Sequence, residues 1–337
     1  MVQKTLVISM FLGILLLVSC NKNKATSEQN DSPIDMQGLN VEYVGDISYG
    51  KYNETKFDIW MPSSQNPTGL LIYIHGGGFT GGDKSVVYEK DKWDFPNEIR
   101  TLLSNKIAVA TINYRLLNLN EENEGILKCM NDAKRALQYI RYYANTYNID
   151  PLNIVLSGTS AGAGTALWIG VNDDLKDLQS SDSILHESTR VKGLALRETQ
   201  SSYNIEDIWI NDVFIDYGIS WSDFLSANED RIYQLYGVAN QVEYESTSTD
   251  LYRDAVDMIA LFSSDDPEIW AENILTKVKA PSTSGIANHH AFHVREIKEK
   301  ADLVGINNIC YYGKNPLIYS DASGESYLGF IIRKINE

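Results

Sequence analysis

The sequence predicts an α/β protein with a mostly parallel central sheet and helices on both faces of it. Three observations point to this class: unbroken apolar runs of strand length, amphipathic stretches of helix length that alternate with them, and glycine-rich segments directly after two of the runs. Strands that are buried on both faces become unbroken apolar runs, and alternation with helices favours parallel pairing. A chain of 337 residues with 43% hydrophobic content can bury one large domain of this kind.

The expected elements follow one another along the chain. Residues 41–61 alternate in polarity and break near Gly45 and Asn53, which predicts antiparallel edge strands. Residues 125–147 repeat apolar side chains at three- and four-residue steps, which predicts a long amphipathic helix. We expect further strands at 70–74, 107–113, 154–156, 191–198, 268–271 and 308–312, and further helices at 95–104 and 325–335.

Residues 199–262 interrupt this alternation. They are rich in Asp, Ser, Tyr and Trp, and they show helical patches without a strand. We expect them to form a cap, or short lid, over the carboxyl ends of the strands, where α/β sheets bind their ligands.

The N-terminal 36 residues are expected to lie outside the domain, which we place at 37–337. A short apolar stretch follows a single lysine and predicts a signal peptide over residues 1–19. This peptide is followed by Cys20 in the letters LVSC, which resemble a bacterial lipobox and imply lipid attachment to that thiol; the alternative is an ordinary secretory signal with a coincidental cysteine. Residues 20–36 are polar and predict a flexible tether. We therefore expect a bacterial lipoprotein, periplasmic or on the cell surface, that meets the membrane only through its lipid anchor.

Charge and cysteine content exclude several classes of partner. A net charge of −16 argues against nucleic acid and against direct contact with anionic lipid. Two cysteines remain besides Cys20, and we expect Cys129 and Cys310 to be buried free thiols. The sequence has neither a C-x-x-C nor an H-E-x-x-H spacing, so it gives no support for a zinc site.

Two glycine-rich segments carry the chemistry. The letters HGGGF at 75–79 follow the apolar run at 70–74, and GTSAG at 158–162 follows the run at 154–156. A serine on a tight strand-to-helix turn exposes its Oγ, and glycines on either side allow that turn without a Cβ clash. A glycine loop leaves backbone N–H groups free to stabilise a developing oxyanion. One such match is weak evidence, but here both segments follow a predicted strand in the required order.

These segments resemble the α/β-hydrolase superfamily, and most closely its bacterial HGGG-type esterase branch, which contains hormone-sensitive-lipase-like and feruloyl-esterase-like enzymes. Further matching letters are NYRL at 113–116, IDP at 149–151 and DDP at 265–267, so the resemblance spans almost the whole predicted domain. It implies an α/β-hydrolase fold and a carboxylic-ester hydrolase that acts on small or carbohydrate-linked acyl esters without a cofactor.

The same resemblance assigns roles to individual residues. Ser160 would be the nucleophile. The backbone N–H groups of Gly77, Gly78 and Ala161 would form the oxyanion hole. His75 would brace the glycine loop rather than carry protons.

The sequence differs from the family pattern at the position of the catalytic base. Such enzymes carry a histidine after the last strand, and no histidine follows residue 312 here. Instead, His289, His290 and His293 cluster in the region that normally supplies the acid. Two explanations stay open: the base has migrated, with His290 (or His293) reaching Ser160, or the fold is a catalytically silent binding protein. Metal binding by the three imidazoles is a third reading, although no carboxylate lies nearby in the sequence.

The acid is the least determined member of the site. Asp265 and Asp266 precede their strand and therefore lie at its amino end, where we expect them to cap the turn before Pro267. Glu198 and Glu272 lie toward the carboxyl ends of their strands and are better placed. We take Glu198 as the candidate acid, with an ordinary surface or capping contact as the alternative.

Overall fold

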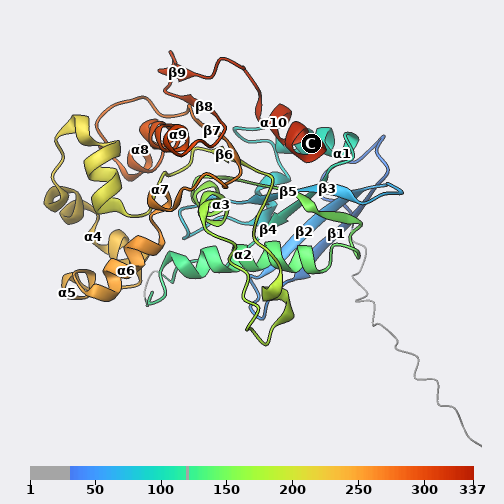
Figure 1. The fold of residues 1–337 in the computed structure, drawn as a ribbon, viewed down its shortest axis with the longest axis horizontal. Coiled ribbons are helices and arrows are strands. Elements are labelled where there is room, and N and C mark those ends of the chain that lie inside the picture. Colours follow the sequence, from blue (N-terminus) through green and yellow to red (C-terminus); the bar gives the residue numbers. More distant parts are fainter. Residues whose placement is uncertain (1–30, 119–120) are drawn as a thin grey trace, which may run out of the picture.

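A nine-stranded sheet runs through the centre of the computed structural model, which describes residues 31–118 and 121–337 (Figure 1). The strand order is β1-β2-β4-β3-β5-β6-β7-β8-β9. All neighbours from β4 to β8 pair in parallel, whereas β1-β2, β2-β4 and β8-β9 pair antiparallel. The strands are β1 (Val41–Ser48), β2 (Lys56–Pro62), β3 (Thr68–Ile74), β4 (Ala108–Ile112), β5 (Ile149–Thr159), β6 (Gly193–Arg197), β7 (Glu268–Asn273), β8 (Asn308–Tyr312) and β9 (Tyr319–Ser320).

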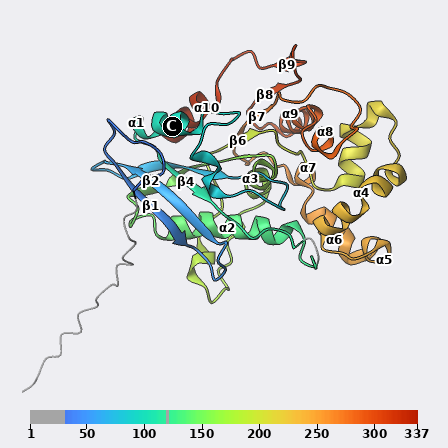
Figure 2. The ribbon, with the colours of Figure 1, turned by 180° about the vertical axis from the view of Figure 1, so that it is seen from behind.

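Helices cover both faces of this sheet, as the sequence predicted (Figures 1 and 2). One face packs against α1 (Phe95–Ser104) and α10 (Tyr327–Asn336). The other face packs against α2 (Ile126–Tyr142), α3 (Ala161–Val171) and α9 (Phe292–Val304). The strands between them are almost wholly buried, which explains their unbroken apolar runs.

The segment between β6 and β7 is helical and contains no strand among the described residues, as expected of the cap. In Figure 1 it projects at one end of the sheet, coloured yellow to orange. Its members are a π-helical segment η3 (Ile205–Val213), a short η4 (Ile215–Tyr217), α4 (Trp221–Tyr236), α5 (Gln241–Tyr244), α6 (Thr247–Ala255) and α7 (Met258–Leu261).

Several element boundaries differ from those expected. The helix predicted over 125–147 ends at Tyr142, because the chain then turns through Asn148, at φ +51°, to enter β5. Strand β5 is longer than its apolar run, since Ile149 already pairs with Thr68. The short helix α8 (Ser284–Asn288) and the two-residue strand β9 were not predicted, because neither has an apolar period of its own.

The described chain begins inside the predicted tether. Ile34 is buried, and the Trp60 indole N–H donates to Ser32 Oγ at 2.9 Å, so residues 32–34 pack on the domain. The signal peptide and Cys20 lie outside the described residues. No helix in the described part is long and apolar enough to cross a membrane. Cys129 and Cys310 are buried free thiols, which confirms that prediction.

Candidate active site

Ser160 occupies the sharp turn between β5 and α3. Its φ of +55° and ψ of −125° are unusual for a residue with a side chain, and such strain persists only where the surroundings impose it. The surroundings are tightly packed: a Cβ on Gly162 would lie 2.0 Å from Ile74 O, and one on Gly158 would lie 2.4 Å from the Gly162 carbonyl carbon. The flanking glycines are therefore required for α3 to pass close to β3, and the turn leaves Ser160 half-buried at the sheet edge.

The glycine loop after β3 lies beside this turn. Gly77 has φ +113° and accepts from the N–H groups of Thr80 and Gly81, which closes the loop. The N–H groups of Gly77, Gly78 and Ala161 have no acceptor within the described part of the chain. Gly78 and Ala161 line the same pocket as Ser160, and Gly77 precedes that lining by one residue. Three free donors therefore lie in or next to the region where an oxyanion would form.

His75 packs as a brace for this loop. Its ring stacks on Tyr114, with centroids 4.4 Å apart, and its Nδ1 lies 2.7 Å from Gly76 O. Tyr114 in turn donates to the carbonyl of His75 at 2.9 Å. Burial lowers the pKa of His75, so the imidazole is neutral at pH 7. This arrangement agrees with the bracing role expected from the sequence.

The imidazole that reaches the serine is that of His289. Its Nε2 lies 2.8 Å from Ser160 Oγ. His289 is the C-cap of helix α8, and the hydroxyl of the N-cap residue Thr283 accepts from Ile286 N. Burial, together with the ammonium of Lys92, lowers the pKa of His289 to about 4. The ring is therefore neutral at pH 7 and its Nε2 can accept the hydroxyl proton.

The structure does not bring His290 or His293 to Ser160, so the expected contact is corrected. The ring of His290 is fully buried, with Nε2 3.0 Å from the hydroxyl of Tyr217. His293 is also fully buried, with Nε2 2.9 Å from Ala287 O. Consecutive side chains leave the end of α8 in different directions, and only the first of the three faces the serine. No group of three or more His, Cys, Asp or Glu side chains among the described residues is placed to hold a metal ion.

Glu198 directly follows β6, in the left-handed region at φ +51°. Its Oε1 accepts from the N–H groups of Ile274 and Leu275 at 2.9 and 3.0 Å, whereas its buried Oε2 has no hydrogen-bond partner among the described residues. Burial raises the pKa of Glu198 to about 7. The backbone N–H of Ser160 donates to Arg197 O at 2.9 Å, so Glu198 is one residue from a direct contact with the nucleophile's main chain.

Gln200 ties Glu198 to the segment that carries His289. Its Nε2 donates to Asn288 O at 2.6 Å and, more weakly, to Glu198 O at 3.4 Å. No hydrogen bond joins the side chains of Glu198 and His289 within the described structure. The Oε2 of Glu198 is buried without a partner, and the imidazole Nδ1 of His289 makes no hydrogen bond with a described residue.

The other carboxylates that the sequence offered lie in ion pairs. Asp265 and Asp266 precede β7 and pair with Arg190, and Asp266 also accepts from Ser263 N at 2.8 Å. This agrees with the turn-capping role expected of them at the amino end. Glu272 faces Arg197, at 3.3 Å from its Nε, and is thereby engaged in the pairing of β6 with β7.

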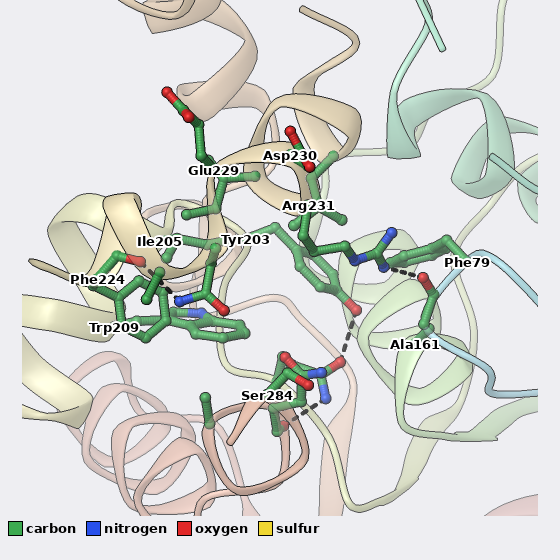
Figure 3. Close-up of a pocket in the computed structure, with 18 of the residues that line it drawn as sticks. Phe79, Ala161, Tyr203, Ile205, Trp209, Phe224, Glu229, Asp230, Arg231 and Ser284 are labelled. Atoms are coloured by element: carbon green, nitrogen blue, oxygen red, sulfur yellow. Dashed lines mark hydrogen bonds between the residues drawn. The ribbon is translucent and has the colours of Figure 1, made fainter. Parts of the chain in front are cut away.

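A pocket of about 640 Å³ opens beside Ser160 (Figure 3). One side comes from the glycine loop and the start of α3, and the other from the cap. Its lining combines large apolar side chains with uncharged polar groups, the carboxylates of Glu229 and Asp230, and one guanidinium. Cap residues in this lining include Tyr203, Ile205, Trp209, Phe224, Ser226, Asn228, Arg231 and Leu235.

The sequence predicted Ser160 and the glycine loop as site residues, and these stay predictions. For the base it named His290 (or His293) instead of His289, because the directions of the three side chains depend on the unpredicted helix α8, and it passed over Arg231. Arg231 gave no signal at all, since an arginine in a polar helix is usually a solvated surface residue.

Comparisons with known proteins point to an esterase family. A family model described as BD-FAE matches residues 57–229. A chlorogenic acid esterase of Aspergillus niger is 32% identical over 133 residues, which are 34% of this chain and 24% of that protein. A probable carboxylic ester hydrolase, LipM, of Mycobacterium tuberculosis is 33% identical over 141 residues, 39% of this chain and 29% of that protein. The chain thus spans only about a quarter of the length of these curated relatives.

Solved structures share the fold at low sequence identity. A truncated carbohydrate esterase from gut microbiota superposes with a TM-score of 0.60 at 17% identity, covering 88% of this chain and 96% of that one. The likeness covers most of this chain and confirms the predicted fold class.

Proposed function

The chain belongs to the BD-FAE family of α/β-hydrolase esterases, and from this premise we propose that it is a serine ester hydrolase. Ser160 is the nucleophile and His289 the general base. The observation that carries the proposal is the 2.8 Å contact between Ser160 Oγ and His289 Nε2 beside a pocket with free backbone donors. A catalytically silent scaffold is not favoured, because its main support was the absence of a base near the serine.

The proposed reaction passes through an acyl-enzyme. Ser160 Oγ attacks the ester carbonyl carbon while its proton moves to His289 Nε2, and the N–H groups of Gly77, Gly78 and Ala161 hold the oxyanion. When the tetrahedral intermediate collapses, the C–O bond to the alcohol breaks and the alcohol leaves with the proton from His289. Water then attacks the acyl-serine in the same way, which releases the acid and restores Ser160. Each oxyanion donor contributes about 3 kcal/mol to such a step.

We assign the acid to Glu198. An ionised carboxylate near the imidazole stabilises the imidazolium that forms during the reaction. Glu198 has one oxygen anchored by two backbone N–H groups and one without a partner, and His289 Nδ1 lacks an acceptor. A direct or water-mediated contact between these two groups is part of this proposal.

For the substrate we propose small or carbohydrate-linked acyl esters. The aromatic side chains of Trp209 and Phe224 give flat apolar walls, while Gln200 and Asn228 offer amides to hydroxyl groups. One curated relative is named for chlorogenic acid and one similar structure for carbohydrate, and both names agree with such a lining.

The test is covalent labelling by a fluorophosphonate probe, together with turnover of p-nitrophenyl acetate. We expect the wild-type protein to be labelled near neutral pH and Ser160→Ala to be neither labelled nor active. Ser226→Ala removes a hydroxyl from the same pocket and serves as the control, with labelling retained. A wild-type protein that neither reacts with the probe nor hydrolyses any short ester would overturn the proposal and reinstate a binding role.

We also propose that the mature protein is held at a bacterial membrane through a lipid on Cys20. This rests on the LVSC letters alone, since Cys20 lies outside the described residues. Cys20→Ala should leave the membrane fraction or stay unprocessed. A variant that is cleaved and remains membrane-bound like the wild type would exclude the lipoprotein assignment.

A further inference from the structure

Arg231 reaches from the cap into the active-site pocket. It lies in helix α4, and its guanidinium donates from Nη2 to the carbonyl of Gly78 in the oxyanion loop. Figure 3 shows the side chain running toward Phe79 and Ala161, whereas the carboxylates of Glu229 and Asp230 point away from that part of the pocket. A cation therefore stands beside the place where the ester must bind.

This guanidinium is poorly compensated. Its bond to Gly78 O is its single hydrogen bond, its Nη1 is buried without a partner, and it forms no ion pair within the described part of the chain. Each of the other described arginines bonds a carboxylate or two or more backbone carbonyls. Those arginines are Arg100, Arg115, Arg135, Arg141, Arg190, Arg197, Arg253, Arg295 and Arg333.

Burying a guanidinium without an ion-pair partner is unfavourable in free energy. Removing the charge from water is unfavourable unless an anion or several acceptors replace the lost hydration. Burial accordingly lowers the pKa of Arg231 from its ordinary value. A ligand that brings its own negative charge would supply the missing partner, and a carboxylate suits the planar fork of a guanidinium.

We propose that Arg231 binds an anionic group of the substrate, so that the enzyme prefers esters carrying a carboxylate close to the scissile bond. This inference rests on the proposed function and specifies its substrate class. Two uncharged polar residues of the lining, Tyr203 and Gln200, form a hydrogen bond with each other at 2.8 Å, and the lining also includes the carboxylates of Glu229 and Asp230. No other cationic side chain lines the pocket among the described residues, so Arg231 would carry the preference alone.

The rival role for Arg231 is purely local. Its bond to Gly78 O could serve only to hold the oxyanion loop against the cap. Loss of Arg231 would then slow the hydrolysis of neutral and anionic esters equally. The two roles are therefore separated by a ratio of rates, not by an absolute rate.

Two matched pairs of esters provide that ratio. On the acyl side, mono-p-nitrophenyl glutarate is compared with p-nitrophenyl valerate, in which a methyl group replaces the carboxylate. On the alcohol side, monoacetylated galacturonic acid is compared with monoacetylated galactose. We expect Arg231→Met to lower the anionic-to-neutral ratio of kcat/KM by about 20-fold or more in at least one pair. Arg231→Lys should retain part of the preference, and Arg253→Met, which removes an ion-paired cap arginine, should leave the ratio unchanged.

Binding separates failure of this inference from failure of the proposed function. In the Ser160→Ala background, calorimetric titration with the same esters requires no turnover, and Arg231→Met should weaken the anionic ester of the preferred pair by a similar factor. If the wild type hydrolyses no ester, the proposed function fails, and these titrations still decide the role of Arg231. Ratios of rate and of affinity that stay the same in Arg231→Met for both pairs would overturn the inference and leave Arg231 as a loop brace.

Discussion

At the ends of β3 and β5 the backbone itself builds the proposed active site, whereas at the ends of β6 and β7 side chains build it. On the first side, glycines permit the turn at Ser160 and leave N–H groups free in the loop. On the second side, Gln200 donates to the carbonyl of Asn288, the neighbour of His289, and the main chain after β7 donates to Glu198. The nucleophile half is thus fixed by close packing of main chain, and the acid–base half by a network of side chains.

The two halves therefore differ in how well they tolerate substitutions. Main-chain packing at van der Waals distance leaves no room for an added methyl group, so the nucleophile half is rigid but easily broken. A hydrogen-bonded network can be assembled from several strand ends, so the base and the acid can move between elements while the reaction stays the same. His289, as the proposed base, would be an example of that freedom.

The histidine cluster gives the largest expected effect. His289→Ala should lower kcat/KM by about a thousandfold or more, because the serine loses its proton acceptor. Stability should change little, since the ring of His289 is only partly buried and has one hydrogen bond. Steady-state kinetics and thermal unfolding of the same preparation measure the two effects.

His290→Ala is the matched control for this variant. The buried ring of His290 bonds Tyr217, so its removal should cost about 2–4 kcal/mol of stability while the folded fraction keeps most of its activity. If His290→Ala instead loses activity without losing stability, the base has been assigned to the wrong imidazole.

The pH dependence tests whether Glu198 belongs to the acid–base half. Its ionised form is the active one in the proposed mechanism, so kcat/KM should fall as the pH drops through its pKa of about 7. In Glu198→Gln this fall of kcat/KM near pH 7 should disappear. The fall that remains at lower pH should follow protonation of His289, whose pKa is about 4. At pH 8 the variant should be about 100-fold slower than the wild type. If kcat/KM of the variant still falls near pH 7 as it does in the wild type, Glu198 is excluded as the acid.

The same substitution, Glu198→Gln, should lower the activity but increase the stability of the protein. The pKa of Glu198 is raised from 4.5 to about 7 on folding, so its contribution to stability is complete below pH 4.5 and is lost as the pH rises through 7. That loss amounts to about 3 kcal/mol, which Glu198→Gln should avoid. Melting temperatures of the two proteins should therefore diverge in favour of the variant between pH 5 and pH 8.

The contrast between the halves also explains what could be predicted from sequence. Strand β8 and helix α1 have the predicted bounds, because an apolar run or an amphipathic period records burial locally. Ser160 and its loop were found for the same reason, since glycines at fixed spacing describe a backbone turn. The contact between Ser160 and His289 joins residues 129 positions apart, and its direction depends on how helix α8 ends. No local pattern in the chain contains that information.

For the cap, even less of the pocket lining could be predicted from the sequence. Its helical character was evident from composition, but the inward direction of Arg231 follows from its packing against the glycine loop. Helix α4 has a kink at Asn228, where φ is −137°, before the turn that carries Arg231. The surrounding sequence contains no pattern that predicts this kink. Specificity residues on such a cap can be read only from tertiary structure.

The smallest expected effect concerns the backbone half, and two glycines of one loop provide the comparison. Gly77→Ala would place a Cβ 2.1 Å from Gly81 O at a φ of +113°, so the loop must shift. We expect a loss of about 10- to 100-fold in kcat, because the donors at Gly77 and Gly78 move relative to the oxyanion, and a cost of about 1–3 kcal/mol in stability.

Gly81→Ala adds the same methyl group where nothing lies within 4 Å and the backbone is not left-handed. It should leave kcat within about twofold of the wild type, because an open surface position tolerates a methyl group. The KM for p-nitrophenyl acetate should change little in either variant, since the oxyanion donors act mainly on the transition state. Equal losses of kcat in the two alanine variants would mean that general loop flexibility, rather than the placement of the N–H groups beside Ser160, sets the rate. The backbone half would then be no more rigid than the side-chain half opposite it.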